Sequence, residues 1–262
     1  MKQSTFQAKG KMIMKIGILG TGNIGTTLVR KLSEAGHEIK VANSRGPETI
    51  DPLILTPGVR ATTAQDAAKD VDVIILSIPF ARHSEIKSLL AGVPEDTVVI
   101  DTANYYPMRD GVIDAIEAGQ VESLWVVEQL GRPIAKAWNA IGARAFAELG
   151  AAAGSPERIA IPVAADRARD REVAMRLVEE TGLDAFDAGP LSESWRQQPG
   201  SPVYCTNLKK GDMGAALASA EKSRLPKRRD LASAVIQERF GLENISNSPA
   251  ETLVALNRAI YM

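Results

Sequence analysis

A glycine-rich turn near the N-terminus constrains the fold of this chain more than any other feature of its sequence. Residues 20–25 read Gly-Thr-Gly-Asn-Ile-Gly and follow an apolar run at residues 14–19, which is typical of a buried parallel strand. After the turn, Ile24, Leu28 and Leu32 recur every four residues and predict a helix. A strand, a GxGxxG turn and a helix in this order predict the first unit of a Rossmann sheet.

The alternation of strand and helix continues to about residue 187. Further strands are predicted at residues 38–42, 71–78, 97–101, 134–138, 158–164 and 184–187. Helices are predicted at residues 63–69, 83–90, 124–130, 141–149 and 169–180, and a Gly/Pro-rich loop at residues 45–59. The fold class is therefore α/β: a doubly wound, mostly parallel Rossmann sheet, with a helical extension at the C-terminus.

The character of the sequence changes near Gly189, beyond which it is helical and polar. We therefore divide the chain into residues 1–12, a disordered extension, residues 13–194, the Rossmann domain, and residues 195–262, a C-terminal helical extension. The first twelve residues are polar and basic and lack the apolar stretch of a signal peptide.

Composition excludes several classes of function. The net charge is −1 over 262 residues, which gives no long-range attraction to nucleic acid or to an anionic membrane. Cys205 is the only cysteine, so thiolate metal clusters within one chain are excluded and no metal is expected. No apolar run approaches the roughly 18 residues that span a bilayer. We expect a cytoplasmic protein.

The glycine turn has the chemistry of a phosphate-binding site. Gly20 permits the tight turn, Gly22 lets the backbone approach a pyrophosphate, and Gly25 lets helix and strand pack closely. The helix start adds free N–H groups and the positive end of its dipole. The alternative is a structural turn in a non-binding α/β protein. The predicted pyrophosphate-binding residues are Gly20, Thr21, Gly22, Asn23, Ile24 and Gly25.

The end of the second strand indicates which dinucleotide is bound. Asn43 lies 18 residues after Gly25, close to the position where NAD enzymes carry a carboxylate for the ribose. Here the residues are Asn43, Ser44 and Arg45, and no acid occurs before Glu48. A hydroxyl and a guanidinium bind a 2′-phosphate, so we predict NADP, with these three residues at its adenosine end. The alternative is that Arg45 is a surface residue of the turn at Gly46-Pro47.

Four stretches of this sequence, taken in order, resemble the NADP-dependent oxidoreductases that use the deazaflavin coenzyme F420. They are residues 15–45, Ser77-Ile78-Pro79-Phe80, Asn139-Ala140-Ile141-Gly142-Ala143 and Asp187-Ala188-Gly189-Pro190-Leu191-Ser192, of which the last is the most specific. The resemblance covers about residues 15–194. The chain departs from the family at Asn139, where the family often has histidine. It also continues about seventy residues past the Gly-Pro-Leu loop, which resembles a bacterial subgroup.

The resemblance implies direct hydride transfer between C4 of NADPH and C5 of the deazaflavin. It places Ile78, Pro79 and Phe80 against the ribose and nicotinamide. It places the segment from Asn139 through Ala140 to Gly142 behind the nicotinamide ring. The Gly189–Ser192 loop, with Pro190 and Leu191 as substrate-binding residues, would close the acceptor side.

Two further regions are candidates for the site. The segment Asp101-Thr102-Ala103-Asn104-Tyr105-Tyr106 ends a parallel strand, where ligands gather in open sheets. Asn104 could bind the carboxamide or ribose and a tyrosine could donate a proton; the alternative is that Asp101 caps the turn and the tyrosines pack the loop.

The second region is residues 195–205, in which Trp195, Arg196, Tyr204 and Cys205 either wall an acceptor pocket, with Trp195 binding substrate, or form a dimer interface. Packing is the better role for Cys205, which has no activating partner in the sequence. His37 and His83 are interpreted as structural.

Together these features predict an NADPH-dependent oxidoreductase that transfers hydride to a deazaflavin or flavin-like acceptor. The alternatives are a reductase of a small imine or carbonyl compound and a non-catalytic NADP-binding protein. Asn139 is a candidate catalytic residue. The expected ligands are NADP(H) and a small-molecule acceptor, which could be coenzyme F420 or a flavin, and the expected assembly is a homodimer.

Overall fold

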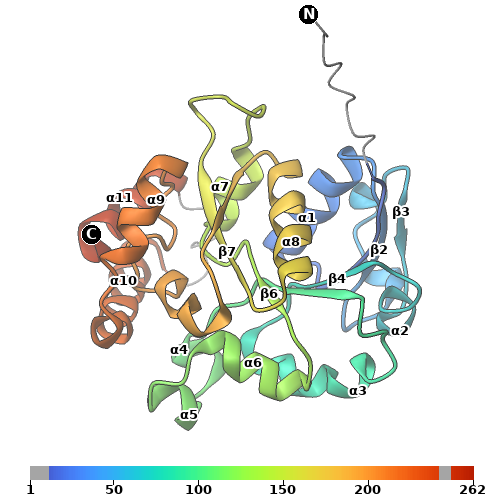
Figure 1. Ribbon diagram of the computed structural model, residues 1–262, viewed down its shortest axis with the longest axis horizontal. Coiled ribbons are helices and arrows are strands. Elements are labelled where there is room, and N and C mark those ends of the chain that lie inside the picture. Colours follow the sequence, from blue (N-terminus) through green and yellow to red (C-terminus); the bar gives the residue numbers. More distant parts are fainter. Residues whose placement is uncertain (1–11, 242–248) are drawn as a thin grey trace, which may run out of the picture.

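The computed structural model describes residues 12–241 and 249–262, which form an eight-stranded sheet covered by helices (Figure 1). Apart from Met12, the predicted disordered extension lies outside the described residues. The strands are β1 (Lys15–Leu19), β2 (Glu38–Ala42), β3 (Val59–Ala61), β4 (Val73–Leu76), β5 (Val98–Asp101), β6 (Ala135–Lys136), β7 (Ala160–Ala165) and β8 (Asp184–Asp187).

The strand order is β3-β2-β1-β4-β5-β6-β7-β8. Strands β1 to β6 are parallel, β7 runs antiparallel to β6 with Lys136 opposite Ala164, and β8 is parallel to β7. This arrangement confirms the predicted doubly wound, mostly parallel sheet. The order reverses between β1 and β4, which is the switch point where open sheets of this kind bind ligands. The three-residue edge strand β3 was not predicted, because it lies at the end of a Gly/Pro-rich loop.

The helices also follow the predicted alternation, although several are shorter. They are α1 (Asn23–Glu34), α2 (Ala64–Ala67), α3 (Lys87–Leu90), α4 (Pro107–Asp110), α5 (Asp114–Glu117), α6 (Glu122–Leu130), α7 (Ala143–Glu148), α8 (Ala168–Glu180), α9 (Lys210–Ala218), α10 (Leu225–Phe240) and α11 (Ala250–Tyr261). Within the described residues, 3-10 segments join them: η1 (Pro47–Thr49), η2 (Pro52–Ile54), η3 (Phe80–Ile86), η4 (Leu191–Gln197) and η5 (Lys222–Arg224). The helix predicted at residues 83–90 is therefore α-helical only in its second half.

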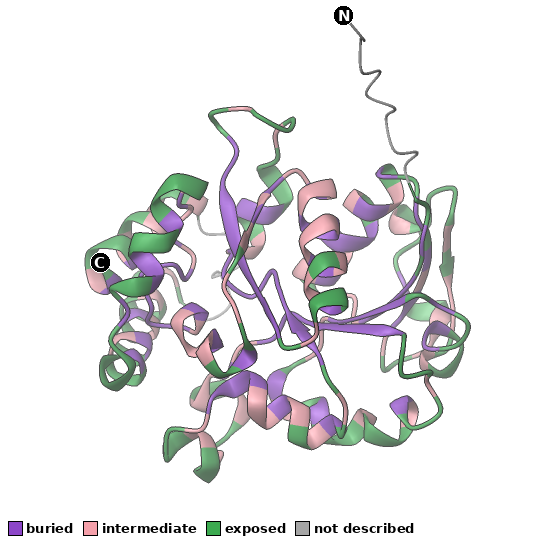
Figure 2. Cartoon of the chain, in the orientation of Figure 1, coloured by how far each residue is buried: buried purple, intermediate pink, exposed green. Residues whose placement is uncertain are grey.

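Two apolar clusters, one on each face of the sheet, make up most of the core. The central strands between them are buried (Figure 2). Successive side chains of a strand point to opposite faces. In β4, for example, Ile75 joins the cluster that contains Leu28 of α1, while Ile74 joins the cluster that contains Val126 of α6. A strand that is buried on both faces needs apolar residues along its length, which is why β4 and residues 98–100 of β5 read as apolar runs.

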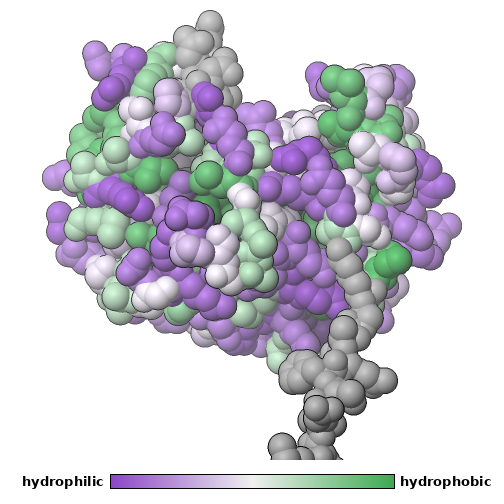
Figure 3. All heavy atoms as spheres, turned by 90° about the horizontal axis from the view of Figure 1, so that it is seen from above, coloured by the Kyte–Doolittle hydropathy of each residue, from purple (hydrophilic) through white to green (hydrophobic). Residues whose placement is uncertain are grey.

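The C-terminal extension is helical, as predicted. Helices α9, α10 and α11 lie together at the end of the sheet remote from β3 (Figure 1). Seen from above, hydrophilic side chains cover most of the surface and hydrophobic ones form separate patches (Figure 3). In residues 12–241 and 249–262, no helix combines the length and apolar character needed to cross a membrane.

Candidate functional site

The glycine turn opens onto a cavity of about 740 Å³ at the carboxyl ends of β1, β2 and β4. This volume lies within the range of roughly 300–1,000 Å³ that is usual for cofactor and ligand sites. Its lining includes Gly20, Thr21, Gly22, Asn43, Ser44, Arg45, Ser77, Ile78, Pro79, Arg82, Glu85, Arg109 and Asp110. The structure thus brings together the phosphate turn, the end of β2 and the segment after β4, as the sequence predicts.

The backbone of the turn requires its glycines for different reasons. Gly20 has φ +113°, and a Cβ there would lie 2.0 Å from the carbonyl oxygen of Ser77. A Cβ on Gly25 would lie 2.1 Å from the carbonyl oxygen of Gly20, so helix α1 could not approach β1 as closely. A Cβ on Gly22 would meet nothing within 4 Å, so at this residue the backbone is open to a ligand. No side chain caps α1 and its first turn contains no acid, so the positive end of its dipole is not neutralised by the chain's own carboxylates.

Beyond β2, Ser44 and Arg45 are exposed and Asn43 holds their loop in place. Asn43 Nδ2 donates to Thr49 Oγ1 at 2.9 Å, and Asn43 Oδ1 accepts from the backbone N–H of Arg45 at 2.9 Å. The acids that line the cavity are each paired with an arginine: Glu85 with Arg82, and Asp110 with Arg109, both at 2.7 Å.

After β4, Ile78 and Pro79 line the cavity but Phe80 does not. Phe80 is fully buried, and its ring stacks on Trp125 of α6 with centroids 4.9 Å apart. The prediction that Phe80 flanks the nicotinamide is therefore wrong, because η3 begins at this residue and directs its side chain into the core.

A cluster of three amides lies beyond β5 and β6. Asn104 Nδ2 donates to the backbone oxygen of Asn139 at 2.9 Å, and Asn139 Nδ2 donates to Asn104 Oδ1 at 3.0 Å. Gln197 Nε2 donates to Asn139 Oδ1 at 2.9 Å, and Asn139 Nδ2 also donates to the backbone oxygen of Gln197. Asn139 is 2% exposed and its amide is fully engaged, so the structure gives it a positioning role and contradicts its candidacy as a catalytic residue.

The Gly-Pro-Leu loop lies at the opposite edge of the sheet from the phosphate turn. Because β7 and β8 run against the other strands, β8 ends at their amino edge. There Gly189 O accepts from Ala165 N, and Leu191 N donates to Asp166 Oδ1 at 2.9 Å. Leu191 is fully buried and Pro190 is exposed, away from the cavity. The sequence cannot show this reversal, and the expectation that these residues bind substrate is wrong.

Trp195 is half-buried on η4, and the Arg196 guanidinium lies 4.2 Å above its ring. Neither residue lines the 740 Å³ cavity. Segment η4 carries the chain from the amino edge back to the amide cluster, where Gln197 lies.

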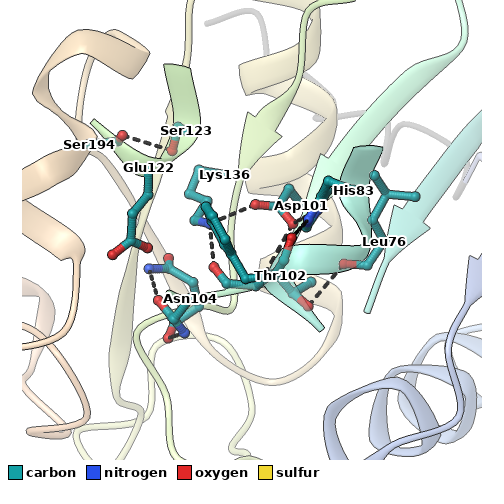
Figure 4. Close-up of polar contacts among 12 residues, drawn as sticks. Leu76, His83, Asp101, Thr102, Asn104, Glu122, Ser123, Lys136 and Ser194 are labelled. Carbon is teal, nitrogen blue, oxygen red and sulfur yellow. Dashed lines mark hydrogen bonds and ion pairs between the residues drawn. The ribbon is translucent and has the colours of Figure 1, made fainter. Parts of the chain in front are cut away.

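Charged side chains are buried at the ends of β5 and β6 (Figure 4). Lys136 is 1% exposed, and its Nζ donates to Asp101 Oδ2 at 2.6 Å and to the backbone oxygen of Ala103. Asp101 Oδ1 lies 2.9 Å from His83 Nε2 and accepts from Ala103 N at 3.1 Å. Burial alone would raise the pKa of Asp101, but the Lys136 ammonium and the His83 ring hold it below its usual range.

Glu122, at the start of α6, is buried on the other side of Lys136 (Figure 4). Its Oε2 accepts from Tyr105 N at 3.1 Å. Burial raises the pKa of Glu122 to about 7, although Lys136 and the Tyr105 N–H favour the ionised form. Glu122 and the Asp101–Lys136 pair together fix the 102–106 segment that carries Asn104 and Tyr106.

Lys136, Glu122 and Gln197 are residues of the site that were not predicted from the sequence. Lys136 could have been noticed, because it is a charged residue within an otherwise apolar predicted strand. Asp101 does shape its own turn, as one interpretation proposed, and His83 is a buried structural partner. His37 is also buried; it accepts from Met14 N at 3.1 Å and contacts Glu180.

A second, smaller cavity of about 190 Å³ lies among α7, α10, α11 and the aromatic residues Tyr106, Tyr204 and Tyr261. Tyr106 Oη donates to Tyr204 Oη at 2.9 Å. Cys205 also lines this cavity, and burial raises the pKa of its thiol to about 12, so the sulfur stays protonated. Tyr106 is the residue before α4, whose Arg109 lines the large cavity, so the segment 106–109 contributes to the walls of both.

In the part of the chain that the structure describes, no group of three or more His, Cys, Asp or Glu residues is arranged to hold a metal ion. A doubly wound sheet with a GxGxxG turn at its switch point, open to a cavity of cofactor size, defines a Rossmann dinucleotide-binding protein. Residues 15–105 match the family model described as NADP oxidoreductase, coenzyme F420-dependent. Over this part the chain is similar to the F420-dependent NADP oxidoreductases, a family of NAD(P)-dependent oxidoreductases.

The curated relatives agree with this class. The F420-dependent NADP reductase of Methanothermobacter thermautotrophicus is 26% identical over 201 residues, which cover 70% of this chain and 84% of that protein. A glycerol-3-phosphate dehydrogenase [NAD(P)+] of Lactobacillus delbrueckii subsp. bulgaricus is 34% identical over 104 residues, 34% of this chain and 30% of that protein. The chain spans between 30% and 58% of the length of three of its curated relatives.

Among solved structures, the hypothetical protein SMa0349 of Sinorhizobium meliloti shares the fold. Its TM-score is 0.65 at 24% identity, with 77% of this chain and 98% of that chain covered.

Proposed function

We propose that this chain binds NADP(H) in the 740 Å³ cavity and uses it to transfer hydride to a small-molecule acceptor beyond the ends of β5 and β6. The observation that supports this most directly is the pairing of the phosphate turn with Ser44 and Arg45 in one cavity. The pyrophosphate would lie on Gly22 and the start of α1, and the 2′-phosphate on Ser44 and Arg45.

The charge of the cavity favours NADP over NAD. Glu85 and Asp110 are each neutralised by an arginine, so neither opposes a 2′-phosphate near Arg45. We expect Arg45→Glu to weaken NADPH by roughly 1.5–3 kcal/mol, about 10- to 150-fold in Kd, and to leave NADH nearly unchanged. Nicotinamide fluorescence measures both constants. Arg60→Glu makes the same charge change at an exposed residue of β3 outside the cavity lining and serves as the control. If Arg45→Glu still prefers NADPH over NADH to the same degree, Arg45 does not bind the 2′-phosphate.

The dinucleotide would cross the switch point, with its nicotinamide half towards Ser77–Pro79 and the ends of β5 and β6. When bound as NADPH it supplies the hydride. The chain's own contribution is to hold the ring and exclude water, since hydride transfer between rings needs orientation more than an acid or base. The Asn104–Asn139–Gln197 cluster and the Asp101–Lys136 pair give this end of the site a rigid frame.

Two classes of acceptor are compatible with this proposal. The family resemblance supports a deazaflavin or flavin-like ring; the small 190 Å³ cavity beside the frame supports a small carbonyl or imine compound. Stopped-flow absorbance of NADPH, mixed with coenzyme F420, FMN, aldehydes or cyclic imines, separates them. Tight NADPH binding without oxidation by any of these would instead favour a non-catalytic NADP-binding protein.

A further inference from the structure

The 190 Å³ cavity is the size of a single-ring molecule. For comparison, an apolar protein cavity of about 150 Å³ binds benzene. The cavity therefore holds one ring with a few substituents, and the three fused rings of a deazaflavin exceed it.

The cavity carries hydrogen-bonding groups of both kinds. Tyr106 Oη donates to Tyr204 Oη, and the hydroxyl proton of Tyr204 is directed either to the neighbouring Cys205 thiol, with which Tyr204 also forms a side-chain hydrogen bond, or to a ligand. Asn257 is 4% exposed; its Nδ2 donates to the backbone oxygen of Cys205 at 3.2 Å, while its Oδ1 has no hydrogen-bond partner among the described residues. Because buried polar atoms are almost always paired, Asn257 Oδ1 indicates a ligand that donates a hydrogen bond.

The charges around the cavity favour a neutral ligand. Its described lining contains no carboxylate. Arg144 lies in the lining, but its guanidinium bonds Glu148 at 2.7 Å. The remaining walls are apolar side chains of α10 and α11, such as Ile236, Leu253 and Val254.

The small cavity lies at the same edge of the sheet as the large cavity, on the side where the nicotinamide would lie. Tyr106 follows β5, Gly142 follows β6 and precedes α7, and both line the small cavity. Arg109, one turn after Tyr106, lines the large cavity. Both cavities are thus at the carboxyl edge of the sheet, where the dinucleotide's nicotinamide half would lie.

We propose that the 190 Å³ cavity is the acceptor site, and that the acceptor is an uncharged carbonyl compound of one-ring size that carries a hydrogen-bond donor. This inference rests on the proposed NADP(H)-dependent hydride transfer. Tyr204 Oη donates to the carbonyl oxygen, and Asn257 Oδ1 accepts from the ligand's hydroxyl or N–H group.

The reaction balances with these groups. The carbonyl carbon gains hydride from C4 of the reduced nicotinamide, so NADPH is oxidised to NADP⁺ and the carbonyl is reduced. The C=O π bond breaks, and its oxygen takes the proton of Tyr204, which yields the alcohol. Tyr106 then passes its own proton to Tyr204 and regains one from water. Burial raises the pKa of Tyr204 well above its usual value, so the hydroxyl is protonated until the oxygen of the acceptor becomes basic.

The first test measures binding without the dinucleotide. The three isomers of hydroxybenzaldehyde are titrated into the protein by calorimetry, with 4-carboxybenzaldehyde as a charged comparison. We expect at least one neutral isomer to bind, and Val254→Phe, which fills the cavity from α11, to weaken it at least tenfold. Val235→Phe makes the same change on an exposed face of α10 outside the lining and is the matched control. Binding that is absent, or equal in the two variants, overturns the assignment of the cavity.

The second test follows NADPH oxidation by the isomer that binds. We expect Tyr204→Phe to lower kcat by about 100-fold or more, the usual contribution of a general acid, while the Kd for NADPH is unchanged. Asn257→Leu, which is close in size, should instead raise KM. If the wild type binds NADPH and reduces coenzyme F420, and Val254→Phe reduces it at the same rate, the cavity proposal alone would be refuted. A wild type that does not bind NADPH would refute the proposed function itself.

Discussion

Lys136 is the most deeply buried cation at the end of the sheet, and its removal tests how the frame of the site is stabilised. Lys136→Met keeps a similar length and apolar stem but removes the ammonium that bonds Asp101 Oδ2 at 2.6 Å. Asp101 is 0% exposed, so its carboxylate would lose its principal counter-charge in a place that water cannot reach. The backbone oxygen of Ala103 would lose its bond to Lys136 as well.

Breaking a buried ion pair from one side costs about 3–5 kcal/mol, because the remaining charge is buried and uncompensated. We therefore expect Lys136→Met to lower the free energy of unfolding by that amount, measured by urea titration followed by circular dichroism. Lys87→Met is the control, since Lys87 is exposed and a surface change of this kind stays within about 0.5 kcal/mol. Adding Asp101→Asn to Lys136→Met removes the isolated carboxylate and should restore part of the loss. A loss in Lys136→Met equal to that in Lys87→Met, or no recovery in the double variant, would show that the pair does not stabilise the fold.

Three further predictions concern the buried acid, the turn and the core. The folded pKa of Glu122 is raised to about 7 from 4.5, so its contribution to stability is greatest below pH 4.5 and decreases by about 3 kcal/mol as the pH rises through 7. Glu122→Gln should abolish this slope in urea titrations from pH 4.5 to 8, and parallel profiles would contradict the burial effect. Gly20→Ala places a Cβ 2.0 Å from Ser77 O at φ +113°, so we expect a lower Tm and weaker NADPH binding, whereas Gly92→Ala, which meets nothing within 4 Å, should change neither. Phe80→Leu should cost about 1–3 kcal/mol of stability with an unchanged Kd for NADPH, and a selective loss of NADPH affinity would restore Phe80 to the cofactor site.

The fold could be predicted from the sequence because its signals are local. The GxGxxG turn, the apolar runs of β4 and β5 and the four-residue spacing in α1 each follow from the contacts of neighbouring residues. The end of β2 could be located for the same reason, since its distance from the turn is set by one helix. These are the parts of the site that the structure gathers into one cavity, with Ser44 and Arg45 beside the turn.

The acceptor side could not be predicted in this way, because it depends on strand direction and on long-range pairing. Nothing within residues 158–165 distinguishes a parallel strand from an antiparallel one, yet this choice moves Pro190 and Leu191 to the far edge. The pairing of Lys136 with Asp101 joins residues 35 positions apart, and Gln197 meets Asn139 across 58. The position of Phe80 was predicted wrongly for a simpler reason. In a 3-10 turn, neighbouring side chains point in different directions, so Pro79 lines the cavity while Phe80 packs in the core.

The antiparallel direction of β7 also separates the C-terminal segment from the strands that carry the phosphate turn. The chain leaves the sheet at the amino edge and must cross back along η4 before its last sixty residues reach the ends of β5 and β6. That late segment can be lengthened or exchanged without displacing any strand that carries the phosphate turn. Under the proposed function, donor and acceptor would therefore be recognised by separate stretches of polypeptide. A high identity confined to the first hundred residues therefore bears on dinucleotide binding and leaves the substrate of a relative undetermined.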